Sequence, residues 1–292
     1  MTLYDVALAP FVEYGFMRRA LVACLGLSLS SGIIGTLLVL RRMSLMGDAL
    51  AHAILPGAAL GFLIGGFWLP ALTLGGLAAG LVVALLAGAV TRTTRVREDA
   101  SLGATYPIAL AFGVLVISLN GSTIDLMHLL FGSILAVDDM ALFLVAGIAT
   151  VTLLVMATVY RPLVLECFDP GFLAALGGGG AMYHQLFLGL TVLNLIAGFQ
   201  ALGTLMTVGL MILPAVAATF WAREIGSLAL IATSIAATSG LVGLLISFHI
   251  DVPSGPAIIL AAGAVFVLSV LLGPHADLSR RLRPQTTRLD PT

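Results

Sequence analysis

Charged side chains are scarce in this chain of 292 residues. Only 9% of its residues are Asp, Glu, Lys or Arg, whereas 60% are hydrophobic, and its mean hydropathy is +1.14. Soluble domains carry about 25% charged residues. The composition therefore excludes an ordinary soluble domain and indicates that a lipid bilayer surrounds most of the chain. The formal net charge of −1 gives no indication of nucleic-acid binding, and no nucleic-acid partner is predicted.

Lysine is absent altogether, so all thirteen Lys or Arg positions are arginines. The phosphate-binding loop of P-loop ATPases needs a lysine to hold the terminal phosphates of the nucleotide. The chain therefore cannot be such an ATPase, and the glycine run at 177–180 is not a nucleotide loop. Any energy taken from ATP would have to come from a partner chain. The two cysteines, Cys24 and Cys167, lie far apart, which indicates neither a disulfide framework nor a thiolate metal site.

Long apolar runs are what the sequence does contain. They are continuous rather than alternating, a pattern typical of membrane-spanning helices. At roughly 20 residues per span, the chain is expected to be an all-α polytopic membrane protein with about eight to nine transmembrane helices. The predicted spans are 20–40, 48–66, 69–90, 102–119, 140–160, 185–199, 203–220, 227–248 and 257–273.

The chain divides into three predicted regions. Residues 1–15 are mildly amphipathic and too mixed to span, residues 16–274 form the membrane domain, and residues 275–292 form an arginine-rich tail. The span at 203–220 is short and contains Pro214. A re-entrant course therefore stays open for it, and with it the side of the N-terminus.

Arginine marks alternate breaks between the predicted spans. Cytoplasmic loops of membrane proteins carry an excess of Lys and Arg, so these breaks and the C-terminus are predicted to be cytoplasmic and the N-terminus external. The arginines concerned are Arg41, Arg42, Arg92, Arg95, Arg97, Arg161, Arg223, Arg280, Arg281, Arg283 and Arg288. The opposite side has only Arg18 and Arg19.

Two ionisable residues, Asp48 and His52, stand at the head of the apolar run 48–66, and the other thirteen carboxylates fall in the predicted breaks. Four residues apart on a helix, they share one face. A charged side chain at bilayer depth costs about 2.5–3.5 kcal/mol on insertion scales, so it indicates a function. The pair is predicted to bind a transported divalent cation.

The same pair has a purely structural alternative. Asp48 follows Gly47 and could cap a helix that begins there, with His52 hydrogen-bonding the capping carboxylate. Two ligands are also too few for a metal, because Zn²⁺ takes about four and Mn²⁺ about six. A homodimer would place both pairs around one axis. Such a set of oxygens and nitrogens suits Mn²⁺, Zn²⁺ or Fe²⁺ better than Mg²⁺ or Cu⁺.

The longest predicted hydrophilic insertion, 161–184, contains a short helix signal at 169–177. An Asp-Pro pair is typical of a helix start, three apolar residues then share one edge, and a glycine ends the turn. The residues concerned are Asp169, Pro170, Phe172, Leu173, Leu176 and Gly177. An exposed apolar edge in a cytoplasmic loop needs a partner to cover it; the alternative is a helix lying on the bilayer surface.

The remaining histidines carry weaker signals. Asp125 with His128, and His249 with Asp251, are interpreted as solvated loop residues. His184 and His275 have no acidic neighbour at ligand spacing in the sequence, and no role is assigned to them.

Four stretches together resemble one known family. MSLMGDALAHAILPGAALGF closely resembles the signature of the permease subunits of bacterial manganese/zinc/iron ATP-binding-cassette importers. HLLFGSILAVDD, FDPGFLAALG and GTLMTVGLMILPAVAAT resemble other landmarks of that family, in the same order. The resemblance covers roughly residues 18–273. It implies that Asp48 and His52 are the intramembrane metal ligands and that 169–177 is the coupling helix that docks on the ATPase.

The resemblance also implies a function and its partners. The chain would be a multi-pass permease of the bacterial cytoplasmic membrane that imports Mn²⁺, Zn²⁺ or Fe²⁺, without catalytic activity or a permanently bound cofactor. Its partners would be a second permease copy, separate ATPase subunits and an extracellular metal-binding protein. Two alternatives are a secondary carrier, which would need further intramembrane acids, and an intramembrane enzyme, for which no H-E-x-x-H motif or paired aspartates occur in the spans.

The distribution of arginine generates a prediction about topology. Single cysteines at position 95 and in the C-terminal tail should be shielded from impermeant thiol reagents in intact cells, because arginine-rich breaks stay in the cytoplasm. A cysteine at position 123 should label. Labelling at position 95 from outside would overturn the orientation.

Overall fold

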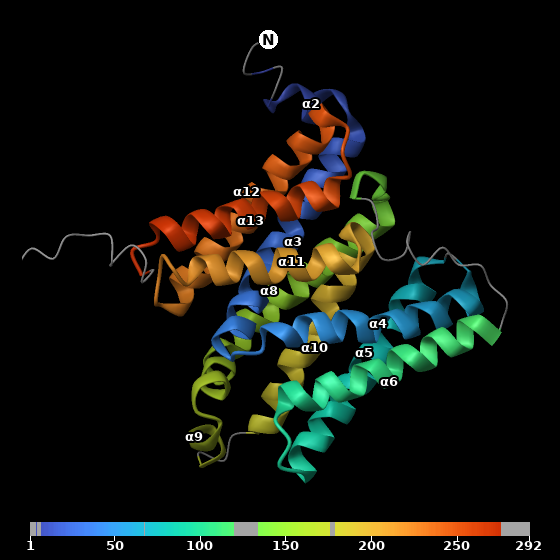
Figure 1. The fold of residues 1–292 in the computed structure, drawn as a ribbon, viewed down its shortest axis with the longest axis vertical. Coiled ribbons are helices and arrows are strands. Elements are labelled where there is room, and N and C mark those ends of the chain that lie inside the picture. Colours follow the sequence, from blue (N-terminus) through green and yellow to red (C-terminus); the bar gives the residue numbers. More distant parts are fainter. Residues whose placement is uncertain (1–3, 5–6, 67, 120–133, 176–178, 276–292) are drawn as a thin grey trace, which may run out of the picture.

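The computed structural model describes residues 4, 7–66, 68–119, 134–175 and 179–275, and within them the chain forms helices and no strand (Figure 1). The helices are α2 (Ala9–Glu13), α3 (Gly15–Leu40), α4 (Ser44–Gly65), α5 (Leu69–Thr93), α6 (Glu98–Leu119), the 3-10 helix η1 (Ile134–Ala136), α8 (Asp139–Phe168), α9 (Pro170–Ala175), α10 (Gly180–Leu202), α11 (Thr204–Ala218), α12 (Ile225–Ile250) and α13 (Ser254–Leu272).

The predicted polytopic architecture is confirmed. In the described part of the chain, seven helices are long and apolar enough to cross a membrane, namely α3, α4, α5, α8, α10, α12 and α13. The two other predicted spans fall on α11, a shorter apolar helix, and on α6, which begins with the acidic Glu98 and Asp99. Each predicted span therefore coincides with one helix.

Helices α3, α4 and α10 form the centre of the bundle. Between 61% and 72% of the most apolar window of each is buried, against 28–33% for α5, α8, α12 and α13. All of these helices are apolar on every side, so periodicity does not identify the inner face. Small residues do, because they allow backbones to approach closely in lipid.

Glycine contacts hold α4 against its neighbours. A Cβ at Gly57 would collide with the carbonyl oxygen of Gly75 on α5, and one at Gly61 would collide with the carbonyl oxygen of Ala71. On the other side, a Cβ at Gly113 of α6 would collide with Pro56. α4 is therefore in backbone contact with α5 and tightly packed on α6, which fixes the direction of its remaining face.

The described parts of the arginine-bearing breaks lie at one end of the bundle, which we call the arginine end. Arg41, at the end of α3, pairs with Glu166 near the end of α8. Leu40 packs with Ala218 at the end of α11. α11 runs from the end of α10 to the break before α12, across the middle of the bundle (Figure 1).

Helix α8 corrects the predicted boundary at position 160. The hydrophilic insertion was expected to cover 161–184, but α8 continues to Phe168 and α10 begins at Gly180. Pro162 lies inside α8 and bends it, with non-helical backbone angles at Val159 (φ −115°, ψ 20°). Proline removes one hydrogen bond and clashes with the preceding turn, which kinks a helix that packing otherwise sustains.

The glycine contacts generate a prediction about stability. Gly75→Ala should lower the melting temperature of the purified protein, because its Cβ meets the α4 backbone and overpacking costs about 1–3 kcal/mol. Gly88→Ala is the matched control on the same helix, since no atom lies within 4 Å of its added Cβ. Equal melting temperatures for the two variants would contradict the close contact of α4 and α5.

Candidate functional site

Asp48 and His52 lie one turn apart on α4. The Nε2 atom of His52 is 3.7 Å from Oδ1 of Asp48. The helix begins at Ser44 with Met43 as its N-cap residue, so Asp48 is a helix-interior residue. The capping alternative for Asp48 is therefore wrong. The expected helix start at Asp48 was wrong because the tight turn after α3 lets α4 begin already at Ser44.

The pair lies on the one stripe of α4 that the protomer leaves open. Leu45, Asp48, His52 and Leu55 follow one another at spacings of three or four residues and are not buried, whereas all the residues between them are buried. The side chains of Asp48 and His52 are 51% and 31% exposed. Both potential ligands therefore point away from the packed core of their own protomer.

A neighbouring aromatic ring orients His52. Tyr106 of α6 stacks on the imidazole with ring centroids 6.0 Å apart and an interplanar angle of 23°. The imidazole of His52 is thus contacted by Tyr106 from α6 and by the Asp48 carboxylate from its own helix, α4. The arrangement positions one oxygen and one nitrogen donor on the same face, which is half of the set that a four-coordinate divalent ion takes.

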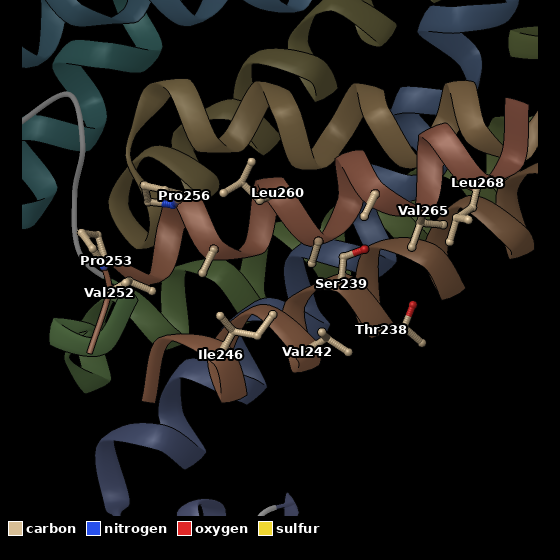
Figure 2. A pocket seen from close by; sticks show the side chains of 13 residues that line it. Thr238, Ser239, Val242, Ile246, Val252, Pro253, Pro256, Leu260, Val265 and Leu268 are labelled. Atoms are coloured by element: carbon tan, nitrogen blue, oxygen red, sulfur yellow. The ribbon is translucent and has the colours of Figure 1, made fainter. Parts of the chain in front are cut away.

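Within one protomer, the part of the chain that the structure describes supplies no third ligand beside Asp48 and His52. Among the described residues, no group of three or more His, Cys, Asp or Glu side chains is placed to hold a metal ion. An apolar groove of about 550 Å³ lies between α12 and α13 (Figure 2). The residues that line it are uncharged, with Thr238 and Ser239 as its hydroxyl groups, so it offers no alternative site for a cation.

The predicted short helix after α8 is present as α9. The Asp169 carboxylate accepts a hydrogen bond from the Phe172 amide at 2.8 Å, as a capping aspartate does. Phe172 is exposed, but Leu173 is buried, so the expected exposed edge is wrong for Leu173. Leu176 and Gly177, the rest of that expected edge and its end, lie outside the described residues.

Sequence reasoning missed a polar cluster at the arginine end. An Nη atom of Arg41 is 3.3 Å from Oε1 of Glu166, and the two side chains are only 6% and 9% exposed. The other Nη atom lies 3.1 Å from Nδ1 of His184. Nε2 of His184 is 2.5 Å from Oε1 of Glu98. We call these four residues the polar junction.

The polar junction corrects two expectations. Glu166 was placed in a hydrophilic break, but it is a buried residue of α8. His184 has no acidic neighbour at ligand spacing in the sequence and was assigned no role, but the fold brings Glu98 and Glu166 beside it. The apolar residues around Glu166 continue the helix beyond Pro162 and were a usable signal. No sequence signal indicated that Arg41 would pair with Glu166 or His184, because these residues are far apart in the sequence.

A bundle of membrane-spanning helices, with an acid–imidazole pair on the open face of a central helix, defines a membrane transport subunit. The chain belongs to the ABC 3 transport family, whose profile matches residues 13–273. It is therefore the membrane-spanning subunit of an ATP-binding-cassette transporter, a multi-pass protein of the bacterial inner membrane and not an enzyme. The resemblance noted in the sequence is confirmed.

Individual relatives share most of their length with this chain. The manganese import system permease protein ScaB of Streptococcus parasanguinis is 34% identical over 263 residues, which is 90% of this chain and 92% of the relative. The chelated iron transport system membrane protein YfeD of Yersinia pestis is 32% identical over 292 residues, 99% of this chain and 96% of the relative. The solved structure of PsaBC from Streptococcus pneumoniae in complex with Fab superimposes with a TM-score of 0.83 at 30% identity, covering 96% of this chain and 100% of that chain.

Proposed function

We propose that this chain is the permease of an importer of Mn²⁺, Zn²⁺ or Fe²⁺, and that Asp48 and His52 bind the ion during its passage. The observation that carries the proposal is the open stripe of α4. A carboxylate and an imidazole lie on it, half-exposed and oriented, in a helix that is otherwise packed on its neighbours. Ionisable residues within membrane spans mark ion pathways.

The open stripe also supports a homodimer. One protomer offers two donors, and a two-fold axis beside α4 would bring Asp48 and His52 of a second copy to the same point. Leu45 on this stripe is 82% exposed, and a second copy would cover it. The resulting two oxygens and two nitrogens would surround one ion, which explains why a single protomer contains only half a site.

The ligand types favour a borderline transition metal. Imidazole nitrogen suits Mn²⁺, Fe²⁺ and Zn²⁺, whereas Mg²⁺ prefers oxygen ligands alone and Cu⁺ prefers sulfur. The names of ScaB and YfeD refer to manganese and to iron. Competition among Mn²⁺, Fe²⁺ and Zn²⁺ for the purified complex would identify the physiological ion.

Helix α9 is the proposed docking site of the ATPase. It lies at the arginine end, its start is fixed by the Asp169 cap, and Phe172 projects from it with 51% exposure. Leu173 faces inward and anchors the helix to the bundle. An exposed aromatic side chain on a short, anchored helix is the kind of group that a partner pocket binds. An extracellular binding protein would deliver the ion at the opposite end.

A secondary carrier is the competing function. Such a carrier would need an acid free to take up a coupling ion. Glu166 is a second acid within a long helix, but it is paired with Arg41, and the family assignment argues against a carrier. Uptake by the isolated chain in proteoliposomes, under an ion gradient and without an ATPase, would favour the carrier.

Metal ligation at Asp48 can be tested with an isosteric change. Asp48→Asn should leave the complex assembled but lower bound Mn²⁺ by more than about tenfold, because even second-shell changes cost 10–100-fold in metal affinity. His52→Ala should be as severe, since in a two-fold assembly each change removes two ligands. Bound metal per purified complex and Mn²⁺ uptake in cells are the measurements. Normal transport by assembled Asp48→Asn would refute the site.

Docking through α9 can be tested at Phe172. Phe172→Asp should abolish co-purification of the ATPase while membrane insertion persists, because a charge replaces the exposed aromatic group. Val252→Asp is the control, at an exposed position in the break between α12 and α13. Recovery of the ATPase with the Phe172 variant at the control level would count against the docking assignment.

A further inference from the structure

The polar junction joins four helices at the arginine end. Arg41 ends α3, Glu98 begins α6, Glu166 lies in the last turns of α8, and His184 lies in the first turns of α10. The guanidinium of Arg41 also lies over the Phe187 ring, 4.7 Å from its centroid. One side chain of Arg41 therefore contacts both α8 and α10.

Stability alone does not account for this arrangement. Removing two charges from water costs about as much as their attraction returns, so a buried ion pair is weak evidence for stabilisation. Oε2 of Glu166 is also buried and has no hydrogen-bond donor among the described residues. Retention of an incompletely satisfied pair at a helix junction indicates a role in specifying or switching an arrangement.

A metal site is an unsuitable interpretation of the same residues. One imidazole can give a metal only one of its two nitrogens. Here Nδ1 of His184 contacts Arg41 and Nε2 contacts Glu98, so the acids lie on different sides of the ring. The guanidinium in the centre would also repel a cation.

The junction contacts the anchor of α9. A Cβ at Gly180, the first residue of α10, would lie 3.0 Å from Oε2 of Glu166 and 3.8 Å from the Cδ2 atom of Leu173. Gly180 therefore lies beside both Glu166 and the buried Leu173 of α9. A displacement of α9 must shift the group that pairs with Arg41, because packed side chains transmit displacement.

The junction also contacts the start of α4. Only two residues, Arg42 and Met43, separate Arg41 from this helix. They form a tight turn in which the Met43 amide donates to the Leu38 carbonyl at 2.9 Å and the Arg42 amide donates to the Val39 carbonyl at 3.0 Å. Because this turn is short and its backbone is hydrogen-bonded to α3, movement of Arg41 moves the first turns of α4.

We propose that Arg41 and Glu166, supported by His184 and Glu98, are positioning residues that couple α9 to α4. Movement of α9, when the ATPase acts on it, passes through Leu173 and Glu166 to Arg41 and then through the 42–43 turn to Asp48. This inference rests on the proposed function, because it takes α9 as the docking site and Asp48 as a metal ligand.

The test removes both charges together in the full complex. Arg41→Met with Glu166→Gln avoids leaving a lone buried charge. The double variant should bind Mn²⁺ and its ATPase at wild-type levels, yet take up Mn²⁺ at least about tenfold more slowly, within the usual 5–150-fold range of coupling effects. Its ATP hydrolysis should no longer respond to the Mn²⁺-loaded binding protein. Arg223→Met, which removes an exposed arginine in the break between α11 and α12, should remain coupled.

Each other outcome overturns the proposal. Uptake within twofold of wild type would show that the pair does not couple the two elements. Loss of bound Mn²⁺ or of the ATPase would assign the pair to the metal site or to docking instead. If the double variant is not recovered from the membrane, His184→Gln decides, with reduced uptake at normal Mn²⁺ binding supporting the proposal and normal uptake refuting it.

Two further measurements distinguish failure of the junction proposal from failure of the proposed metal-import function. Wild-type complex must import Mn²⁺, and Asp48→Asn must lose bound Mn²⁺. Failure of either would refute the proposed function whatever the junction does. If both hold and the double variant stays coupled, only the junction proposal fails.

Discussion

The cost of placing charge in a bilayer governs this structure. Hydrocarbon offers neither water nor counter-ions, so each ionisable side chain needs a partner or an opening. The chain meets this requirement in two ways. Arg41 and Glu166 are enclosed together, whereas Asp48 and His52 face outward from α4 beside each other. The first pair neutralises its charges within the protomer, and the second remains available to a further charged species.

Asp48 and His52 remain exposed because of how the backbone of α4 packs on its neighbours. Gly57 and Gly61 bring α4 against α5, and Gly113 brings α6 against Pro56. These contacts bury the sides of α4 that carry small residues and leave the side that carries Asp48 uncovered. The exposure of Asp48 and His52 therefore depends on glycines that lie on other sides of α4.

Features that depend on residues close together in the sequence could be predicted from it. The spans followed from continuous apolar stretches, and Asp48 with His52 followed from a spacing of four. The polar junction could not be predicted, because the contacts of Arg41 with Glu166 and His184, and of Glu98 with His184, join positions that are 86 to 143 residues apart. The predicted boundary at position 160 was wrong because α8 continues past Pro162, where proline usually ends a helix, and buries Glu166.

The length of α8 has a consequence for how a soluble partner approaches. Its 30 residues correspond to about 45 Å at 1.5 Å per residue, against a hydrocarbon thickness of about 30 Å. Even a tilt of about 20° leaves several residues beyond the acyl chains. α8 therefore extends beyond the acyl chains and places α9 outside the hydrocarbon region. A water-soluble protein that docked on Phe172, as proposed above, would therefore not have to displace lipid.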